Sequence, residues 1–215
     1  MKLKVCGMKY NTKDVAELQP DYLGFIFYEK SPRNFDGEIP TLPENIKKVG
    51  VFVDADIAFA KAQVEKYKLD VIQLHGSESP EYIATLQRVI VDSFETFPEI
   101  WKVFSIKDTF DFSTLLPYKH LVNAFLFDTK GKAKGGNGYT FDWNVLNDYP
   151  FKKPFILSGG IGIEEIENIK EILKTNLPIY TLDVNSKFED SPGLKNIENL
   201  KNFTSQLTSL LERRD

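Results

Sequence analysis

Short apolar segments alternate with longer amphipathic ones over most of this chain. Eight of the short segments are rich in β-branched and aromatic residues and have the length of β-strands. They are residues 3–6, 22–27, 48–53, 71–74, 101–106, 124–128, 155–158 and 180–184. Several, such as 22–27 and 124–128, are apolar almost throughout rather than at alternate positions, which is typical of parallel strands covered on both faces.

Three of the longer segments have the periodicity of amphipathic helices: residues 55–67, 163–173 and 196–211. The apolar side of the first is predicted to comprise Ile57, Ala60, Ala62 and Val64. The links after the fifth and sixth strands are shorter and poorer in this periodicity, so we expect abbreviated connections there.

Eight strands joined mostly by helices over 215 residues predict an α/β fold, a single-domain (β/α)8 TIM barrel spanning residues 1–215. The alternative is an open doubly wound sheet, which usually needs fewer strands and often has a glycine fingerprint after the first. The segment Cys6-Gly7-Met8-Lys9 is no such fingerprint, and no linker-like composition divides the chain. The barrel is therefore favoured.

Composition narrows the class of protein. The chain is 42% hydrophobic but has no segment near the roughly 18 apolar residues of a membrane span, and its first residues lack a secretory signal. Its single cysteine cannot form an intrachain disulfide. A net charge of −4 and a pI near 5.4 argue against nucleic-acid binding. We expect a cytoplasmic protein, monomeric or homodimeric, with neither nucleic acid nor membrane as partner.

Polar residues follow the last two predicted strands, at the end of a barrel where phosphate is commonly held. Gly159 and Gly160 follow the seventh strand just before a predicted helix, so backbone N–H groups and the helix dipole can face an anion. Asp183 closes the eighth, and Asn185 and Ser186 follow it. A Gly-Gly pair alone is also an ordinary turn signal, but the two loops together predict a phosphate site.

Two other strand ends carry groups that can exchange protons. Cys6 closes the first strand, although a free cysteine is more often a small buried apolar residue. Asp128 closes the sixth, and the next helix is predicted to begin near residue 140, too far away for Asp128 to cap it. Both are candidates for general acid–base chemistry. The glycine-rich loop 130–138 is predicted to cover a substrate.

Arg33 and His75 follow the second and fourth strands. The planar fork of Arg33 suits a ligand carboxylate, the alternative being a solvated surface arginine. His75 has only one other histidine in the chain, His120, and no metal-ligand spacing accompanies it. We therefore expect a structural histidine near the barrel mouth rather than a metal ligand.

Taken together, these motifs resemble the phosphoribosylanthranilate isomerase family of tryptophan biosynthesis. The matching segments occur in family order from residue 2 to about residue 200: KVCG (4–7), GFIFY (24–28), SPR (31–33), GVFV (50–53), VIQLHG (71–76), FDT (127–129), GGNGYTFDW (135–143), LSGG (157–160) and LDVNS (182–186), followed by Glu189, SPG (191–193) and Lys195. One departure is Asn185-Ser186-Lys187, where family members often have Ser-Ser-Gly.

The resemblance implies an intramolecular oxidoreductase that converts N-(5-phosphoribosyl)anthranilate to 1-(2-carboxyphenylamino)-1-deoxyribulose 5-phosphate by an Amadori rearrangement, without a cofactor. It implies Asp128 as the acid and Cys6 as the base, whose thiol pKa should then lie below the usual value of about 8.5. Arg33 would hold the anthranilate carboxylate. The other implied substrate-binding residues are Gly159, Gly160, Asp183, Asn185 and Ser186.

Two alternatives keep the phosphate site but change the function. Another phosphate-binding barrel isomerase or lyase would need a different acid–base pair, commonly two carboxylates. A non-catalytic barrel that binds a phosphorylated ligand would need no thiol at position 6.

Overall fold

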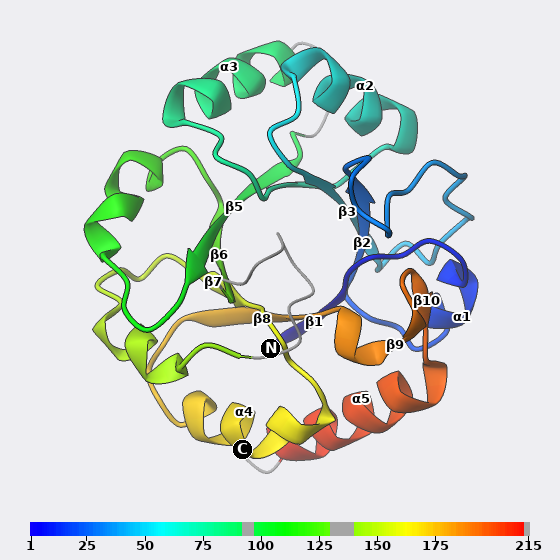
Figure 1. The fold of residues 1–215 in the computed structure, drawn as a ribbon, viewed down its shortest axis with the longest axis vertical. Helices are drawn as coiled ribbons and strands as arrows, with labels where there is room; N and C mark the ends of the chain where they lie inside the picture. Colours follow the sequence, from blue (N-terminus) through cyan, green and yellow to red (C-terminus); the bar gives the residue numbers. More distant parts are fainter. Residues whose placement is uncertain (92–96, 130–139, 213–215) are drawn as a thin grey trace.

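The structure, a computed structural model, describes residues 1–91, 97–129 and 140–212. Its centre is a closed barrel of eight parallel strands in sequence order, with β8 paired to β1 (Figure 1). The strands are β1 (Lys2–Val5), β2 (Tyr22–Phe27), β3 (Lys47–Phe52), β4 (Val71–Leu74), β5 (Glu99–Ile106), β6 (Ala124–Thr129), β7 (Phe155–Leu157) and β8 (Ile179–Val184). The predicted barrel is confirmed, with each strand ending within one residue of its predicted end.

Helices form an outer ring around the strands (Figure 1). The α-helices are α1 (Thr12–Ala16), α2 (Ile57–Tyr67), α3 (Pro80–Val91), α4 (Ile166–Leu173) and α5 (Ile197–Glu212). Four short 3₁₀ helices complete the described helical segments: η1 (Phe112–Tyr118), η2 (Trp143–Asp148), η3 (Ile163–Glu165) and η4 (Ser186–Phe188). An antiparallel hairpin of β9 (Glu189–Ser191) and β10 (Leu194–Lys195) follows β8.

The connections after β5 and β6 are poor in α-helix, as predicted, since the helices described in them are the 3₁₀ helices η1 and η2. The connection after β6, residues 130–154, is however no shorter than the others. The helix predicted to begin near residue 140 is the 3₁₀ helix η2, which begins at Trp143. The Asp142 side chain accepts a hydrogen bond from the Asn144 backbone N–H and caps η2. The predicted covering loop 130–138 lies outside the described residues.

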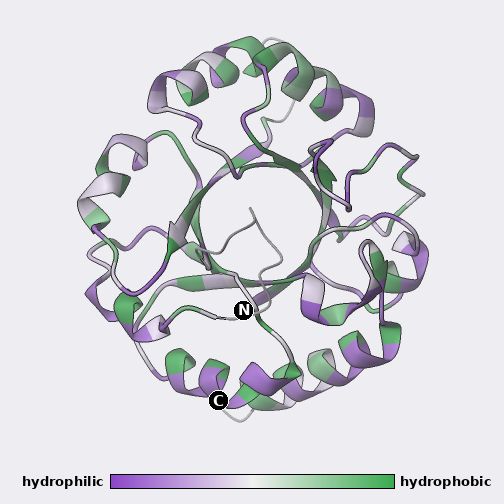
Figure 2. Ribbon diagram, in the orientation of Figure 1, coloured by the Kyte–Doolittle hydropathy of each residue, from purple (hydrophilic) through white to green (hydrophobic). Residues whose placement is uncertain are grey.

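Two apolar clusters fill the molecule. One packs the outward side chains of the strands against the helices and includes Leu3 and Val5, while the other lies inside the barrel and includes Cys6. Figure 2 shows largely hydrophobic strands surrounded by helices of mixed hydropathy. Because side chains alternate along a strand, Lys4 projects inward like Cys6, and it is fully buried there. None of the described helices is long and apolar enough to cross a membrane.

Candidate active site

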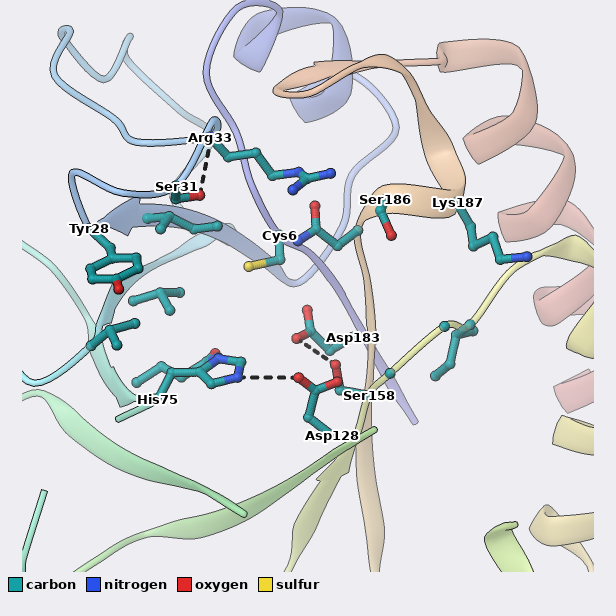
Figure 3. Close-up of a pocket in the computed structure, with 18 residues that line it drawn as sticks. Cys6, Tyr28, Ser31, Arg33, His75, Asp128, Ser158, Asp183, Ser186 and Lys187 are labelled. Carbon is teal, nitrogen blue, oxygen red and sulfur yellow. Dashed lines mark hydrogen bonds and ion pairs between the residues drawn. The ribbon is translucent and has the colours of Figure 1, made fainter. Parts of the chain in front are cut away.

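A pocket opens at the carboxyl ends of the barrel strands (Figure 3). All eight residues named from the sequence as catalytic or substrate-binding line it, namely Cys6, Arg33, Asp128, Gly159, Gly160, Asp183, Asn185 and Ser186. Parallel strands bring these positions together because their carboxyl ends share one rim of the barrel. Residues separated by up to 180 positions in the chain thus face one cavity.

Cys6 follows the last residue of β1, and its sulfur points into the pocket (Figure 3). The next residue, Gly7, has a positive φ of 73°. A Cβ at this position would lie 2.5 Å from Asn185 Oδ1 and 2.8 Å from Arg33 Cδ. Glycine at position 7 therefore permits two other pocket residues to approach the chain beside the thiol.

A buried ionic network lies beneath Cys6. Lys4 Nζ is 2.8 Å from Asp183 Oδ1, and Ser158 Oγ donates to Asp183 Oδ2 at 3.2 Å. Burial raises the pKa of the Cys6 thiol, and the nearby ammonium groups of Lys4 and Lys195 oppose this rise without cancelling it. The expectation of a thiol pKa below the usual value is therefore wrong, because the sequence could not show how deeply the sulfur lies.

Asp128 lies in β6, and its carboxyl group is held from two sides. Oδ1 accepts a hydrogen bond from the Thr129 backbone N–H at 2.9 Å, and Oδ2 lies 3.2 Å from His75 Nε2. His75 Nδ1 is in turn 3.4 Å from the amide nitrogen of Gln73. The sequence alone favours a structural role for His75, but its position gives it a direct contact with the proposed acid.

The first of the two glycines after β7 packs closely against this acid. Gly159 and Gly160 have positive φ angles of 90° and 73°, a region that favours glycine. A Cβ on Gly159 would lie 2.3 Å from Thr129 Oγ1 and 2.8 Å from Asp128 Oδ1. Close packing beside Asp128 is thus one reason for glycine here, independent of any anion.

Arg33 is oriented by the hairpin that follows β8. Its Nε donates to Glu189 at 2.9 Å and its Nη2 at 2.6 Å. Glu189 Oε1 also accepts from Lys195 Nζ at 2.8 Å, and Lys195 Nζ donates to Asn185 Oδ1 at 2.8 Å. Among the described residues, none accepts a hydrogen bond from Nη1 of Arg33.

Sequence reasoning missed Glu189 and Lys195 as site residues. Both were noted only as part of the family-like segment around Ser191-Pro192-Gly193. The available signal was a Glu and a Lys on either side of a Pro-Gly turn close behind the predicted phosphate loop. Such a hairpin can carry two opposite charges to the same place, here beside Arg33 and Asn185.

A salt bridge joins the loops after β7 and β8. Lys187 Nζ is 2.5 Å from Glu164 Oε1 in η3, and the Lys187 side chain lines the pocket. Within the described ranges, no group of three or more His, Cys, Asp or Glu side chains is arranged to hold a metal ion. The described pocket thus offers a thiol, the two carboxyl groups of Asp128 and Asp183, an imidazole and cationic groups for acid–base chemistry on an anionic ligand.

Comparisons with known proteins agree with this chemistry. The family model described as N-(5'-phosphoribosyl)anthranilate isomerase matches residues 3–206. A relative of that name from Parabacteroides distasonis is 42% identical over 96% of this chain and 93% of its own length. The crystal structure of the Thermus thermophilus enzyme is 28% identical, with a TM-score of 0.77 over 98% of this chain and 100% of that one.

A third similar structure, described as generated monomers of the dimeric phosphoribosylanthranilate isomerase of Thermotoga maritima, is 26% identical with a TM-score of 0.73. That match covers 97% of this chain and 99% of the other. A family model matched over nearly the whole sequence, together with a relative of this identity and coverage, settles the assignment. The chain belongs to the N-(5'-phosphoribosyl)anthranilate isomerase family.

Proposed function

We propose that Asp128 and Cys6 are the acid and the base with which this chain isomerises N-(5'-phosphoribosyl)anthranilate. The conversion itself, an isomerisation in tryptophan biosynthesis, follows from membership of the family. The observation that supports these two roles is that a thiol at the end of β1 and a carboxyl group at the end of β6 line one pocket. Another barrel isomerase or lyase with two carboxylates would not need that thiol.

The pocket is proposed to bind the substrate at both of its ends, the phosphate and the anthranilate carboxylate. The phosphate would accept hydrogen bonds from backbone N–H groups of the loops containing Gly159, Gly160, Asn185 and Ser186, since glycines let an anion approach the main chain. Lys187 lines this part of the pocket and adds a positive charge. Asp183 would not bind the phosphate dianion, because like charges repel; it is proposed to accept from a ribose hydroxyl instead.

Arg33 is proposed to bind the anthranilate carboxylate through Nη1. Its Nε and Nη2 atoms already donate to Glu189, which fixes the plane of the guanidinium. Two further contacts fix its loop: Arg33 N donates to Ser31 Oγ at 3.1 Å, and Tyr28 N donates to Asn34 Oδ1 at 2.9 Å. A pre-oriented arginine loses less entropy on binding than a free surface side chain.

In the proposed chemistry Asp128 and Cys6 each carry out one proton transfer. Asp128 gives its proton to the furanose ring oxygen, the C1–O bond breaks, and the nitrogen lone pair forms a cationic C1=N bond. Cys6 then removes the C2 proton, giving an enolamine that tautomerises to the ketone. Because the cation at C1 forms beside the sulfur, it favours the thiolate and offsets part of the effect of burial on the Cys6 pKa.

Holding the substrate at both ends places its ribose between the two catalytic groups. Such positioning can lower a barrier by several kcal/mol, on the order of 7–11 kcal/mol in the most favourable systems. The purified chain should therefore convert the substrate to the ketone without added metal. It should also restore growth of a tryptophan auxotroph that lacks this isomerase, whereas a non-catalytic phosphate-binding barrel would do neither.

We also propose that residues 1–215 form one catalytic domain that acts in the cytoplasm. Its free thiol and its family membership support this location. A monomer and a homodimer both remain compatible with the sequence, and the Thermotoga maritima relative is described as dimeric. Sedimentation velocity on the purified chain distinguishes the two states.

A further inference from the structure

We propose that Lys4 is a positioning residue that supplies the positive charge needed to make the Cys6 thiolate available for catalysis. The proposal rests on the role of Cys6 as base given above and extends it to a residue that does not line the pocket. Lys4 lies two residues before Cys6, and its side chain is fully buried inside the barrel. A buried lysine in a barrel interior is rare enough to need an explanation.

The first support is placement on the strand. Residues two apart on a strand point to the same side, and Leu3 and Val5 belong to the apolar cluster outside the barrel. Lys4 and Cys6 therefore share the interior, with Lys4 one layer below the sulfur. Besides Lys4, the charged groups that act on the sulfur are Asp183, which raises the thiol pKa, and Lys195, which lowers it.

The second support is the space beside the neighbouring strand. A Cβ on Gly24 of β2 would lie 2.9 Å from Cys6 Sγ and 3.2 Å from Lys4 Cε. The sulfur and the end of the lysine stem thus border the same small volume, which exists because position 24 has no side chain. Glycine inside a strand commonly marks such a close approach.

The third support is that Lys4 is paired with a buried carboxylate. Asp183 Oδ1 is 2.8 Å from Lys4 Nζ, and the Asp183 side chain is itself buried. Burial lowers the pKa of Lys4, but the negative charges of Asp183 and of the Cys6 thiolate outweigh burial and raise it. Lys4 therefore stays an ammonium group, and its charge opposes the rise that burial causes in the pKa of Cys6.

A purely structural ion pair needs no thiol nearby. The protein contains such an ion pair for comparison, between Lys102 and Glu78. Lys102 in β5 is buried and lies 3.1 Å from Glu78 Oε2. It also donates to the backbone carbonyl of Gly76 at 2.8 Å, and so ties down the loop after β4. Lys102 is the matched control for the loss of a buried lysine that does not act on Cys6.

The experiment is a pH titration of the thiolate absorbance in the whole protein. Cys6 is the only cysteine, so the signal reports this sulfur alone once a Cys6→Ser variant has been subtracted to remove the tyrosine contribution. Lys4→Met should raise the thiol pKa by about one unit or more, the effect expected for losing a close opposite charge. Lys102→Met should leave the thiol pKa unchanged.

Lys4→Met leaves Asp183 buried without its cation, which destabilises the fold. The pair Asp183→Asn and Lys4→Met/Asp183→Asn avoids this, since both lack the carboxylate and differ only at residue 4. A higher thiol pKa in the double variant than in Asp183→Asn supports the proposal. Equal values in two folded variants, verified by circular dichroism, overturn it.

Kinetics separate this proposal from the assignment of Cys6. If Lys4 acts through the thiol, Lys4→Met should lower kcat by about tenfold or more at neutral pH with little change in KM. The loss of kcat should shrink as the pH rises toward the new thiol pKa. Full turnover by Cys6→Ala would show that Cys6 is not the base. The effect of Lys4 on the thiol pKa would then still be tested by the absorbance titration alone.

Discussion

His75 Nε2 lies 3.2 Å from Asp128 Oδ2, so the ends of β4 and β6 are joined at the pocket by a contact between imidazole and carboxyl groups (Figure 3). The Thr129 backbone N–H holds the other carboxyl oxygen. Asp128 is therefore fixed by one side chain and one main-chain group. A carboxyl group that must reach a single oxygen atom of the substrate benefits from such a fixed orientation.

The first prediction follows from this contact. His75→Ala should reduce kcat by about 10–100-fold, because the carboxyl group that gives the proton loses the side chain that orients it. His75→Gln should recover part of the loss, because its amide can donate from nearly the same place. Steady-state kinetics on both variants test this. Full kcat in a folded His75→Ala would leave the imidazole with only a structural role.

The second prediction concerns the proposed acid and base. Cys6→Ala and Asp128→Asn should each lower kcat by roughly 10²–10⁴-fold, the usual range for loss of a general acid or base. KM should change much less, since neither residue is assigned to an end of the substrate. Single-turnover measurements show whether the chemical step is the one affected. Near-normal turnover in Cys6→Ala would transfer the role of base to a different residue.

The third prediction concerns Arg33. Arg33→Ala should weaken substrate binding by about 1.5–3 kcal/mol, as expected for a lost charged hydrogen bond. Arg33→Lys should not restore it, because a lysine lacks the fork that contacts Glu189 and the ligand at once. Calorimetric titration with inorganic phosphate is the control, since phosphate is assigned to other loops. Equal losses for substrate and phosphate would mean that Arg33 supports the whole site.

Most of the barrel could be predicted because each strand coincides with a short apolar segment, and the end of the segment marks the end of the strand. β2 and β4 match their predicted bounds, and the pocket is lined by every residue that the sequence indicated as catalytic or substrate-binding. The buried faces of the helices were harder to predict than the strands. Ala62 was assigned to the apolar side of its helix, yet it is exposed, and the buried positions of α2 are Ala60, Val64 and Tyr67. Because alanine counts as apolar, the pattern does not single out the three buried positions, which are spaced by four and three residues and face the core.

What the sequence could not show was how charges pair across the barrel. Lys4 and Asp183 are 179 residues apart, and Arg33 and Glu189 are separated by 156. No local pattern encodes such pairs, because they depend on the closure of β8 against β1 and on the hairpin behind it. The same limit explains the thiol pKa, since burial and neighbouring charges are tertiary properties.

The fourth prediction uses the pairing of Glu189. Burial tends to raise its pKa, but the hydrogen bonds of Arg33 and the charge of Lys195 outweigh burial and lower it below 4.5. A carboxyl group with a depressed folded pKa stabilises the fold above its unfolded pKa of about 4.3, and this stability is lost as the pH falls through the folded value. Urea unfolding between neutral pH and about pH 3 should show a weaker pH dependence for Glu189→Gln than for the parent.

The control for this measurement is Asp190→Asn, which removes an exposed carboxyl group on the same strand. Its dependence on pH should stay close to that of the parent, because exposed charges contribute little. Parallel stability curves for Glu189→Gln and the parent would show that the ion pairs of Glu189 do not contribute to the acid sensitivity of the fold.

The last prediction separates the two glycines after β7. Gly159→Ala should lower kcat, because its Cβ would lie 2.8 Å from Asp128 Oδ1 and even closer to Thr129, displacing the acid. Gly160→Val should instead weaken the binding of substrate and free phosphate alike, since its φ of 73° strains a side chain and the loop is the proposed phosphate site. Thermal unfolding identifies variants that no longer fold, and a phosphate soak of parent crystals should place the anion between the loops after β7 and β8. A strained main chain cannot present its N–H groups to the phosphate unchanged, so Gly160→Val should not keep full activity. Full activity of this variant, together with an anion bound reproducibly elsewhere in the parent crystals, would overturn the assignment of the phosphate site.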